Sequence, residues 1–122
     1  MSSRLKGKQI LLAEDAPDNL FLLSLVLEDE GASVTGVEDG IKALELLREK
    51  AFDLAILDLS LPGMDGDDVA IKLNAEGNSN KKIALTGHIS LEKESEQAFD
   101  LILKKPILPD VLIDAVLGCI GN

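Results

Sequence analysis

The fold is decided by a stretch in the middle of the chain, residues 54–66, with the sequence LAILDLSLPGMDG. Its first residues, Leu54 to Leu57, form an apolar run of the length expected for a strand buried on both faces. Asp58 ends that run, and a charged residue is rarely buried in such a place without partners. The Pro and Gly residues that follow favour a turn. The stretch therefore predicts a buried strand that delivers a carboxylate to a loop.

Short apolar runs of this kind recur along the chain and alternate with segments of helical spacing. The expected strands are Gln9–Ala13, Ser33–Val37, Leu54–Leu57, Lys82–Leu85 and Leu101–Leu103. The expected helices are Pro17–Asp29, Asp39–Glu49, Asp67–Ala75, Ser90–Ala98 and Pro109–Ile120. This alternation predicts βαβ units in an α/β fold, with a parallel sheet covered by helices on both faces.

The composition suits one domain with an aliphatic core. The chain has 122 residues, of which 46% are hydrophobic and only 2% aromatic, so we expect a single domain over residues 1–122. Residues 1–8 are polar and basic and are expected to form a lead-in segment. The only cysteine, Cys119, lies on the apolar stripe of the last expected helix, which indicates a buried hydrophobe rather than a reactive thiol.

The charge and hydropathy patterns exclude several classes of partner. The net charge is −10, and we expect no direct contact with nucleic acid, because phosphate contacts need clustered Lys and Arg. An acidic surface suits a cation or a basic protein partner, or simply solubility. No apolar run approaches the roughly 20 residues of a membrane span, and the N-terminus lacks a signal-peptide pattern. We therefore expect a cytoplasmic domain that does not itself touch a membrane.

Polar side chains follow the expected strands at the points where the strands end. Glu14 and Asp15 follow the first strand, Asp58 the third, Thr86 the fourth and Lys105 the fifth. In open parallel sheets, ligands bind beyond the C-terminal ends of the strands. Each of these residues alone is more often a helix cap or a strand-end residue. Their shared position at one edge is what predicts a functional site.

Such an edge favours a hard cation. Two carboxylates about 4 Å apart repel by roughly 4 kcal/mol at an effective dielectric near 20, so three must be neutralised or partly protonated. Mg²⁺ takes oxygen ligands and keeps several waters, which suits a sparse set of carboxylates. With an ammonium and a hydroxyl nearby, the arrangement resembles a phosphoryl-transfer site in which a carboxylate is the nucleophile.

The ordered set of motifs resembles the response-regulator receiver family over essentially the whole chain. The motifs are Ile10-Leu11-Leu12-Ala13-Glu14-Asp15, then Leu57-Asp58 with Leu61-Pro62-Gly63-Met64-Asp65-Gly66, then Leu85-Thr86-Gly87-His88, and Lys105-Pro106. The resemblance implies a flavodoxin-like, doubly wound (βα)5 fold with a five-stranded parallel sheet of order 2-1-3-4-5. It also implies a place in a two-component phosphorelay.

The resemblance further implies roles for individual residues. Asp58 is the expected phosphoacceptor, Thr86 hydrogen-bonds the phosphoryl group and Lys105 pairs with it. The implied Mg²⁺ ligands are Glu14, Asp15, the Asp58 carboxylate and the backbone carbonyl of Ser60. The implied phosphoryl donor is a histidine kinase or a histidine phosphotransfer protein. The domain is then a self-catalysed phosphoacceptor rather than a turnover enzyme.

Smaller expectations concern residues around the site. The resemblance implies a cis Lys105–Pro106 bond. Asp65 is expected to be a turn residue rather than a ligand, Lys104 to be solvated, and His88 to lie at the rim rather than to be a phosphohistidine. Ser60 and His88 flank the site and are candidates for tuning hydrolysis of the acyl phosphate.

Three departures from the family pattern bear on output. Three residues before Lys105, where the family usually has Tyr or Phe, this chain has Ile102, which has no ring to rotate. The segment from Thr86 to Lys105 is about one helical turn shorter than usual, so the fourth helix should be short and polar. The first acid is Glu14 rather than Asp, which gives a longer reach to the metal.

Several alternatives stay open at the level of sequence. The lead-in and the motifs favour a receiver within a hybrid sensor histidine kinase, tethered to the membrane only through that parent protein. The alternatives are a free-standing response regulator and a pseudo-receiver that only binds partners. In every case we expect the domain to be a monomer or weak dimer. A haloacid-dehalogenase-type phosphatase is disfavoured because Ser60 stands where a second Asp is needed. The acidic loop after the first strand disfavours a flavodoxin-like cofactor binder.

The absence of an aromatic residue at position 102 generates a prediction. If the usual aromatic rotation carries the signal in this family, binding of beryllofluoride, a phosphoryl mimic, should change the surroundings of Ile102 little. Amide chemical shifts before and after addition of beryllofluoride and Mg²⁺ measure this. Large shifts around Ile102 would contradict the expectation.

Overall fold

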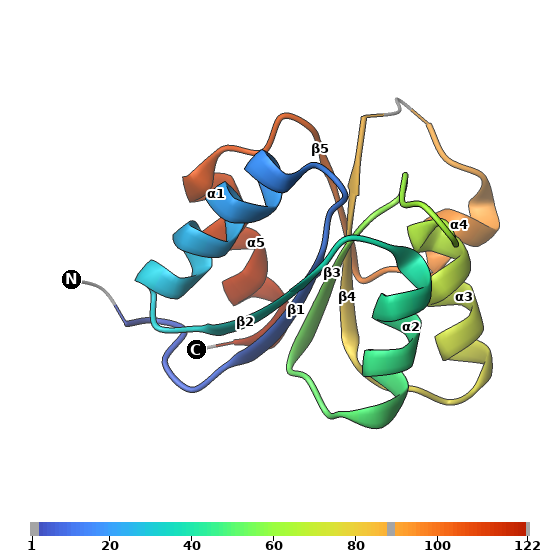
Figure 1. Ribbon diagram of the computed structural model, residues 1–122, viewed down its shortest axis with the longest axis horizontal. Helices are drawn as coiled ribbons and strands as arrows, with labels where there is room; N and C mark the ends of the chain where they lie inside the picture. The colour runs from blue at the N-terminus through green and yellow to red at the C-terminus, as the bar shows by residue number, and fades with distance from the viewer. Residues whose placement is uncertain (1–2, 88–89, 122) are drawn as a thin grey trace.

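The computed structural model describes residues 3–87 and 90–121, which form a parallel sheet between two layers of helices (Figure 1). The strands are β1 (Gln9–Ala13), β2 (Ser33–Val37), β3 (Leu54–Asp58), β4 (Lys81–Thr86) and β5 (Leu101–Lys104). The helices are α1 (Pro17–Asp29), α2 (Gly40–Glu49), α3 (Gly66–Ala75), α4 (Lys93–Gln97) and α5 (Pro109–Ile120). The strand order β2-β1-β3-β4-β5 confirms the predicted doubly wound topology. His88 lies outside the described residues.

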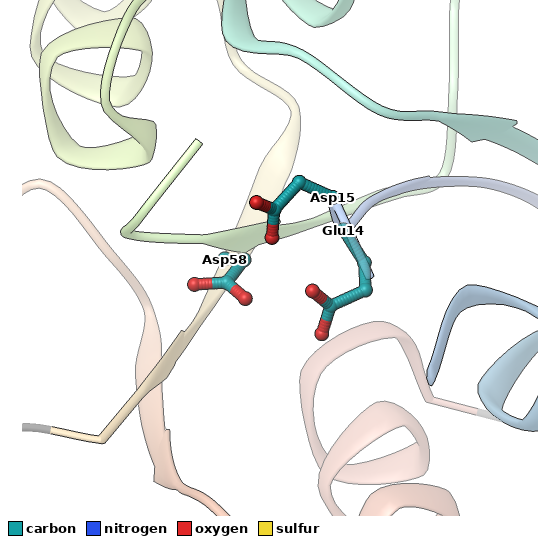
Figure 2. Close-up of side chains that lie close together, drawn as sticks. All are labelled: Glu14, Asp15 and Asp58. Carbon is teal, nitrogen blue, oxygen red and sulfur yellow. The ribbon is translucent and has the colours of Figure 1, made fainter. Parts of the chain in front are cut away.

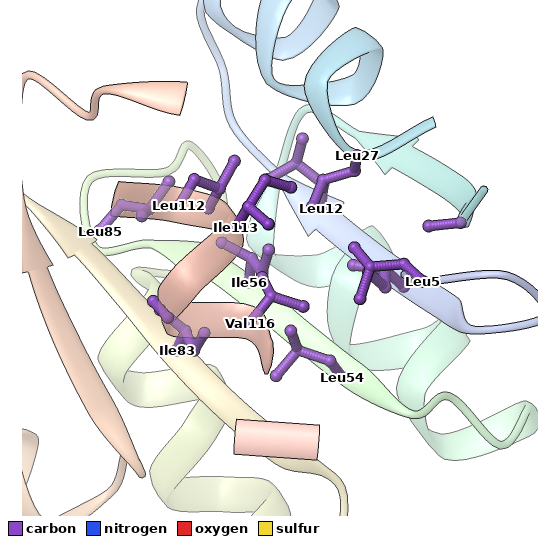
Figure 3. Packing of buried hydrophobic residues seen from close by; sticks show 13 residues of the cluster. Leu5, Leu12, Leu27, Leu54, Ile56, Ile83, Leu85, Leu112, Ile113 and Val116 are labelled. Atoms are coloured by element: carbon purple, nitrogen blue, oxygen red, sulfur yellow. The ribbon is translucent and has the colours of Figure 1, made fainter. Parts of the chain in front are cut away.

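The central strands are buried on both faces, which explains their continuous apolar runs. Along β1, Ile10 and Leu12 pack into the layer of α1 and α5, whereas Leu11 and Ala13 pack into the layer of α2 and α3. The neighbouring strand β3 repeats this alternation in register, with Ile10 opposite Leu54. Figure 3 shows the first of these two clusters, built almost entirely from Leu, Ile and Val. The two cores are therefore mainly aliphatic, with Phe52 buried in the second.

The elements lie where the sequence predicts them, and their ends differ from the prediction by at most one residue except at α4. Both α1 and α5 begin and end where expected, and α2 begins one residue late because Asp39 is its N-cap and accepts a hydrogen bond from the Lys42 amide. The expected helix over Ser90–Ala98 is wrong in length, since only Lys93–Gln97 is helical. That segment has no apolar face to hold additional turns against the sheet, and isolated short helices are marginal in water.

The lead-in segment is more structured than its polar composition indicates. Leu5 is completely buried in the cluster between α1 and α5, and its amide donates to the Glu30 carbonyl at 2.8 Å. Arg4 forms an ion pair with the Glu30 carboxylate at 3.0 Å. A single apolar residue in a basic segment gives no periodic signal, so the sequence did not reveal this contact.

Other expected surface and core residues can be placed. Cys119 is half-buried against the α1–α5 cluster, and burial raises the pKa of its thiol, in keeping with a packing role. Asp65 is the N-cap residue of α3, and Lys104 is exposed. Among residues 3–87 and 90–121, no helix is long and apolar enough to cross a bilayer.

The packing of β1 predicts a large effect from one core substitution. Leu12→Ala removes a completely buried side chain and should lower the free energy of unfolding by about 3 kcal/mol, measured by urea denaturation. The matched control is Leu22→Ala on α1, because the Leu22 side chain is 58% exposed and its loss should cost below about 0.5 kcal/mol. Equal effects of the two substitutions would refute this assignment of the core.

Candidate functional site

The C-terminal ends of four strands meet at one edge of the sheet. Parallel pairing sets Ala13 beside Leu57 and Thr86 beside Lys104, so the residues that follow β1, β3, β4 and β5 emerge together. Backbone hydrogen bonds extend the pairing past the strands, since the Lys105 amide donates to the Thr86 carbonyl at 2.8 Å. The sheet itself thus brings the predicted site residues to one place.

Three carboxylates converge at this edge. Glu14, Asp15 and Asp58 each offer an oxygen, and these oxygens all lie within 4.8 Å of one another (Figure 2). Glu14 and Asp58 are buried, with 1% and 3% of their surfaces exposed, whereas Asp15 is exposed. The group is therefore a mostly enclosed set of acids with one member at the solvent side.

The Lys105 ammonium forms ion pairs with both buried acids. Its Nζ lies 3.1 Å from Glu14 Oε1 and also forms an ion pair with Asp58 Oδ2. The Lys105–Pro106 peptide bond is cis, as expected. The predicted convergence of Glu14, Asp15, Asp58 and Lys105 is confirmed.

Burial and charge act against each other on the ionisation of this group. Burial raises the pKa of the Glu14 carboxyl, and the neighbouring Asp58 adds to this, although the Ala16 amide and Lys105 oppose it. Burial alone would lower the pKa of Lys105, but its hydrogen bond to Asp58 and its ion pair with Glu14 outweigh that effect and raise it. Lys105 therefore keeps its positive charge, while the carboxylates of Glu14, Asp15 and Asp58 still lie close to one another.

The loop between β3 and α3 is built onto Asp58. The Ser60 amide donates to Asp58 Oδ1 at 2.9 Å, and the Gly66 amide donates to the Leu59 carbonyl at 3.0 Å. A Cβ atom on Gly66 would lie 2.2 Å from the Asp58 carbonyl oxygen, so only glycine allows α3 to begin this close to the acid. Asp58 is thereby fixed through both its side chain and its backbone.

Thr86 and Ile102 lie on the neighbouring strands. Thr86 ends β4, directly after Leu85, which pairs in register with Asp58, and it is buried, with 2% of its surface exposed. Ile102 is half-buried on β5 and pairs in register with Ala84. The metal role expected for the backbone carbonyl of Ser60 stays a prediction.

The residues present fit a hard divalent cation. Glu14 Oε1 is fully buried and, among the described residues, makes no hydrogen bond, although it lies near Lys105 Nζ. A buried carboxylate oxygen without a hydrogen-bond donor retains lone pairs that a cation can use. Three carboxylates form an all-oxygen donor set of the kind that Mg²⁺ prefers over soft metals.

A cleft that the sequence did not reveal opens beside this group. It has a volume of about 370 Å³, reaches Glu14 and Lys105, and is otherwise bordered mainly by apolar residues of α1 and of the segment after β5. On α1, Phe21 and Leu22 expose 64% and 58% of their surfaces. The weak amphipathic pattern of α1 hides this feature, because apolar residues point both inward and outward.

The fold and the acidic edge define a receiver domain, and comparison with known families agrees. The family model described as the response regulator receiver domain matches residues 10–117. This chain belongs to that family and is a receiver domain of two-component signal transduction.

The relatives include sensor kinases and separate receivers. The chain is 37% identical to the sensor protein GacS of Pseudomonas syringae in an alignment 129 positions long. The alignment covers 99% of the chain but only 14% of GacS. A solved receiver domain of a sensor histidine kinase from Pseudomonas aeruginosa has Mg²⁺ coordinated in its active-site cleft, with a TM-score of 0.85, 32% identity, and coverage of 95% and 99% of the two chains. The response regulator TrrA of Thermotoga maritima, solved with Mg²⁺ and BeF, gives a TM-score of 0.84 and 31% identity, with coverage of 91% and 97%.

The ion pairs of Lys105 with Glu14 and Asp58 predict how the stability of the domain changes when Lys105 is replaced by an uncharged residue. In Mg²⁺-free buffer, Lys105→Met leaves two buried carboxylates facing each other and should lower the free energy of unfolding at neutral pH by about 2 kcal/mol, a value reduced for the partial exposure of Lys105. The folded-state pKa of Glu14 then rises further above its ordinary value of 4.5, so the folded state binds protons more tightly than the unfolded one.

It follows that the penalty should be small below pH 4.5 and should grow as the pH rises through the folded-state pKa. Urea denaturation at acidic and neutral pH measures it, and Lys104→Met, at an exposed neighbouring position, is the control. A penalty independent of pH would show that Lys105 does not act through these acids.

Proposed function

We propose that this domain accepts a phosphoryl group on Asp58 from a phosphohistidine, with Glu14, Asp15 and Asp58 holding Mg²⁺. The observation that carries the proposal is the burial of Asp58 beside two further carboxylates and in contact with the Lys105 ammonium. An isolated acid at a strand end needs no such surroundings, whereas an aspartyl-phosphate site needs both a nucleophilic oxygen and positive charge around it.

The transfer is a substitution at phosphorus. A carboxylate oxygen of Asp58 attacks the phosphorus atom and forms a P–O bond, while the P–N bond to the donor imidazole breaks. The bonding electron pair stays on that nitrogen, which takes a proton from water. The product is an acyl phosphate on Asp58 and a neutral histidine.

The chain's own groups orient and stabilise this reaction. The Ser60 amide holds Asp58 Oδ1, which leaves Oδ2, on the side of Lys105, as the attacking oxygen. The Lys105 ammonium then moves from the carboxylate to the charged phosphoryl oxygens. The Thr86 hydroxyl, at the end of the adjacent strand, hydrogen-bonds the phosphoryl group. When bound, Mg²⁺ neutralises the negative charge that accumulates on the phosphoryl oxygens. The Ser60 carbonyl completes its protein ligands.

The cleft beside the site favours a donor of particular character. Its apolar border and the exposed Phe21 and Leu22 provide a surface on which an apolar face of a histidine kinase or histidine phosphotransfer protein can pack. The net charge of −10 favours a donor with basic groups at its rim and disfavours nucleic acid. The donor imidazole reaches Asp58 past Lys105, which borders this cleft.

The similarity to a sensor kinase supports a parent context. We propose that this receiver serves within a hybrid sensor histidine kinase, on the cytoplasmic side of the membrane in which the parent protein is anchored. Support comes from the 37% identity to GacS along 99% of this chain. A free-standing regulator would use the same chemistry at Asp58.

The phosphoacceptor role predicts the result of one mass measurement. Incubation with acetyl phosphate and Mg²⁺ should add one phosphoryl group to the wild-type protein, and Asp58→Asn should abolish the addition because an amide is not a competent nucleophile. EDTA should prevent labelling of the wild type. Intact-mass spectrometry measures each outcome.

The matched control is Asp114→Asn, at an exposed position on α5, which should be labelled like the wild type. Equal labelling of Asp58→Asn and wild type would refute the phosphoacceptor. Labelling that EDTA leaves unchanged would refute the metal role and leave the phosphoacceptor in place.

A further inference from the structure

Helix α4 is anchored by a polar contact rather than by an apolar face. Its sequence, KESEQ, contains a single buried residue, Ser95, which is 8% exposed. Ser95 Oγ donates a hydrogen bond to Asp67 Oδ2 at 2.6 Å. Hydrogen bonds to a carboxylate are stronger than neutral ones, so this contact, together with the packing of Ala98 and Phe99 at the end of the helix, holds a helix too short to be stable alone.

The partner of that bond belongs to the first turn of α3. Figure 1 shows α4 lying against α3, and the end of α4 is attached to the same helix, since Asn74 Nδ2 donates to the Ala98 carbonyl at 3.0 Å. Within residues 3–87 and 90–121, these two side-chain hydrogen bonds of α4 and its C-cap both lead to α3. Any displacement of α3 is therefore passed to α4.

The first turn of α3 is in turn built onto the phosphoacceptor. Gly66 directly precedes Asp67 and packs so closely on the Asp58 backbone that a Cβ atom would lie 2.2 Å from the Asp58 carbonyl oxygen. The Ser60 amide binds the Asp58 carboxylate itself at 2.9 Å. A change in the position or charge of Asp58 therefore acts on the residue next to Asp67.

Strand β5 offers no rotating side chain that could carry a signal away from Asp58. Ile102 on β5 is aliphatic and half-buried, so it has neither a ring nor a hydroxyl with which to exchange positions. The contact path through Gly66, Asp67 and Ser95 needs no rotating side chain, because close packing transmits small shifts directly.

We propose that the Asp67–Ser95 hydrogen bond is a latch that couples α4 to the phosphorylation state of Asp58. The inference rests on the proposed function and adds the direction in which the signal leaves the site. The output of this domain is a change in the position or stability of α4, transmitted through α3 rather than through β5.

The test compares amide chemical shifts and hydrogen exchange of Lys93–Gln97 with and without beryllofluoride and Mg²⁺. In the wild type, beryllofluoride should shift these amides. In Ser95→Ala and in Asp67→Ala the shifts should fall to the level of noise, and exchange within α4 should be about tenfold faster without the ligand, because a charge-assisted bond is lost. Ser95→Thr keeps the hydroxyl and should keep the response.

Two further variants locate the pathway. Ser33→Ala, at an exposed position on the opposite edge strand β2, should behave like the wild type, and so should Ile102→Val. Labelling of Asp58 by acetyl phosphate should be unchanged in Ser95→Ala, because Ser95 takes no part in the chemistry. An undiminished α4 response in Ser95→Ala and Asp67→Ala, or its loss in Ile102→Val, would overturn the latch.

The outcomes also separate this inference from the function on which it rests. If beryllofluoride shifts the amides of Ser60 and Gly66 but never those of α4, the phosphoacceptor stands and the latch is wrong. If the amides of Ser60 and Gly66 also stay unshifted in the wild type, the proposed function fails and takes the latch with it.

Discussion

The ion pairs that Lys105 makes with Glu14 and Asp58 are the interaction on which the acidic edge of this structure depends. They join the ends of β1, β3 and β5, three strands that are far apart in the sequence. Buried like charges repel, and a buried charge left without a partner is strongly destabilising. One ammonium compensates two carboxylates only in part. This deficit of positive charge makes the site receptive to a divalent cation and a phosphoryl group.

The sheet makes this crowding possible. Hydrophobic clusters pack on both faces of its central strands, so the positions of the strand ends do not depend on the polar groups at the edge. Packing of this kind is dense and resists local adjustment. The acids at the edge therefore cannot move apart to relieve their repulsion, and their relative positions are a property of the fold rather than of the loop that carries them.

Much of the fold and of the site could be predicted, for identifiable physical reasons. The strands are buried on both faces and so appear as apolar runs, and parallel topology alone brings Glu14, Asp58 and Lys105 to one edge. The length of α4 was overestimated because a polar segment has no periodicity to mark its ends. The bond between Ser95 and Asp67, 28 residues apart, and the burial of Leu5 depend on single tertiary contacts, which no local pattern encodes.

The docked lead-in has a mechanical consequence. Arg4 and Leu5 are attached to Glu30, at the end of α1 that lies away from the acidic edge. A pull on the chain ahead of Leu5 would be borne by this attachment, which lies near the start of β1, whereas Asp58 lies at the opposite, C-terminal end of the parallel strands. The reactive edge is thus insulated from strain that reaches the domain through its N-terminal segment.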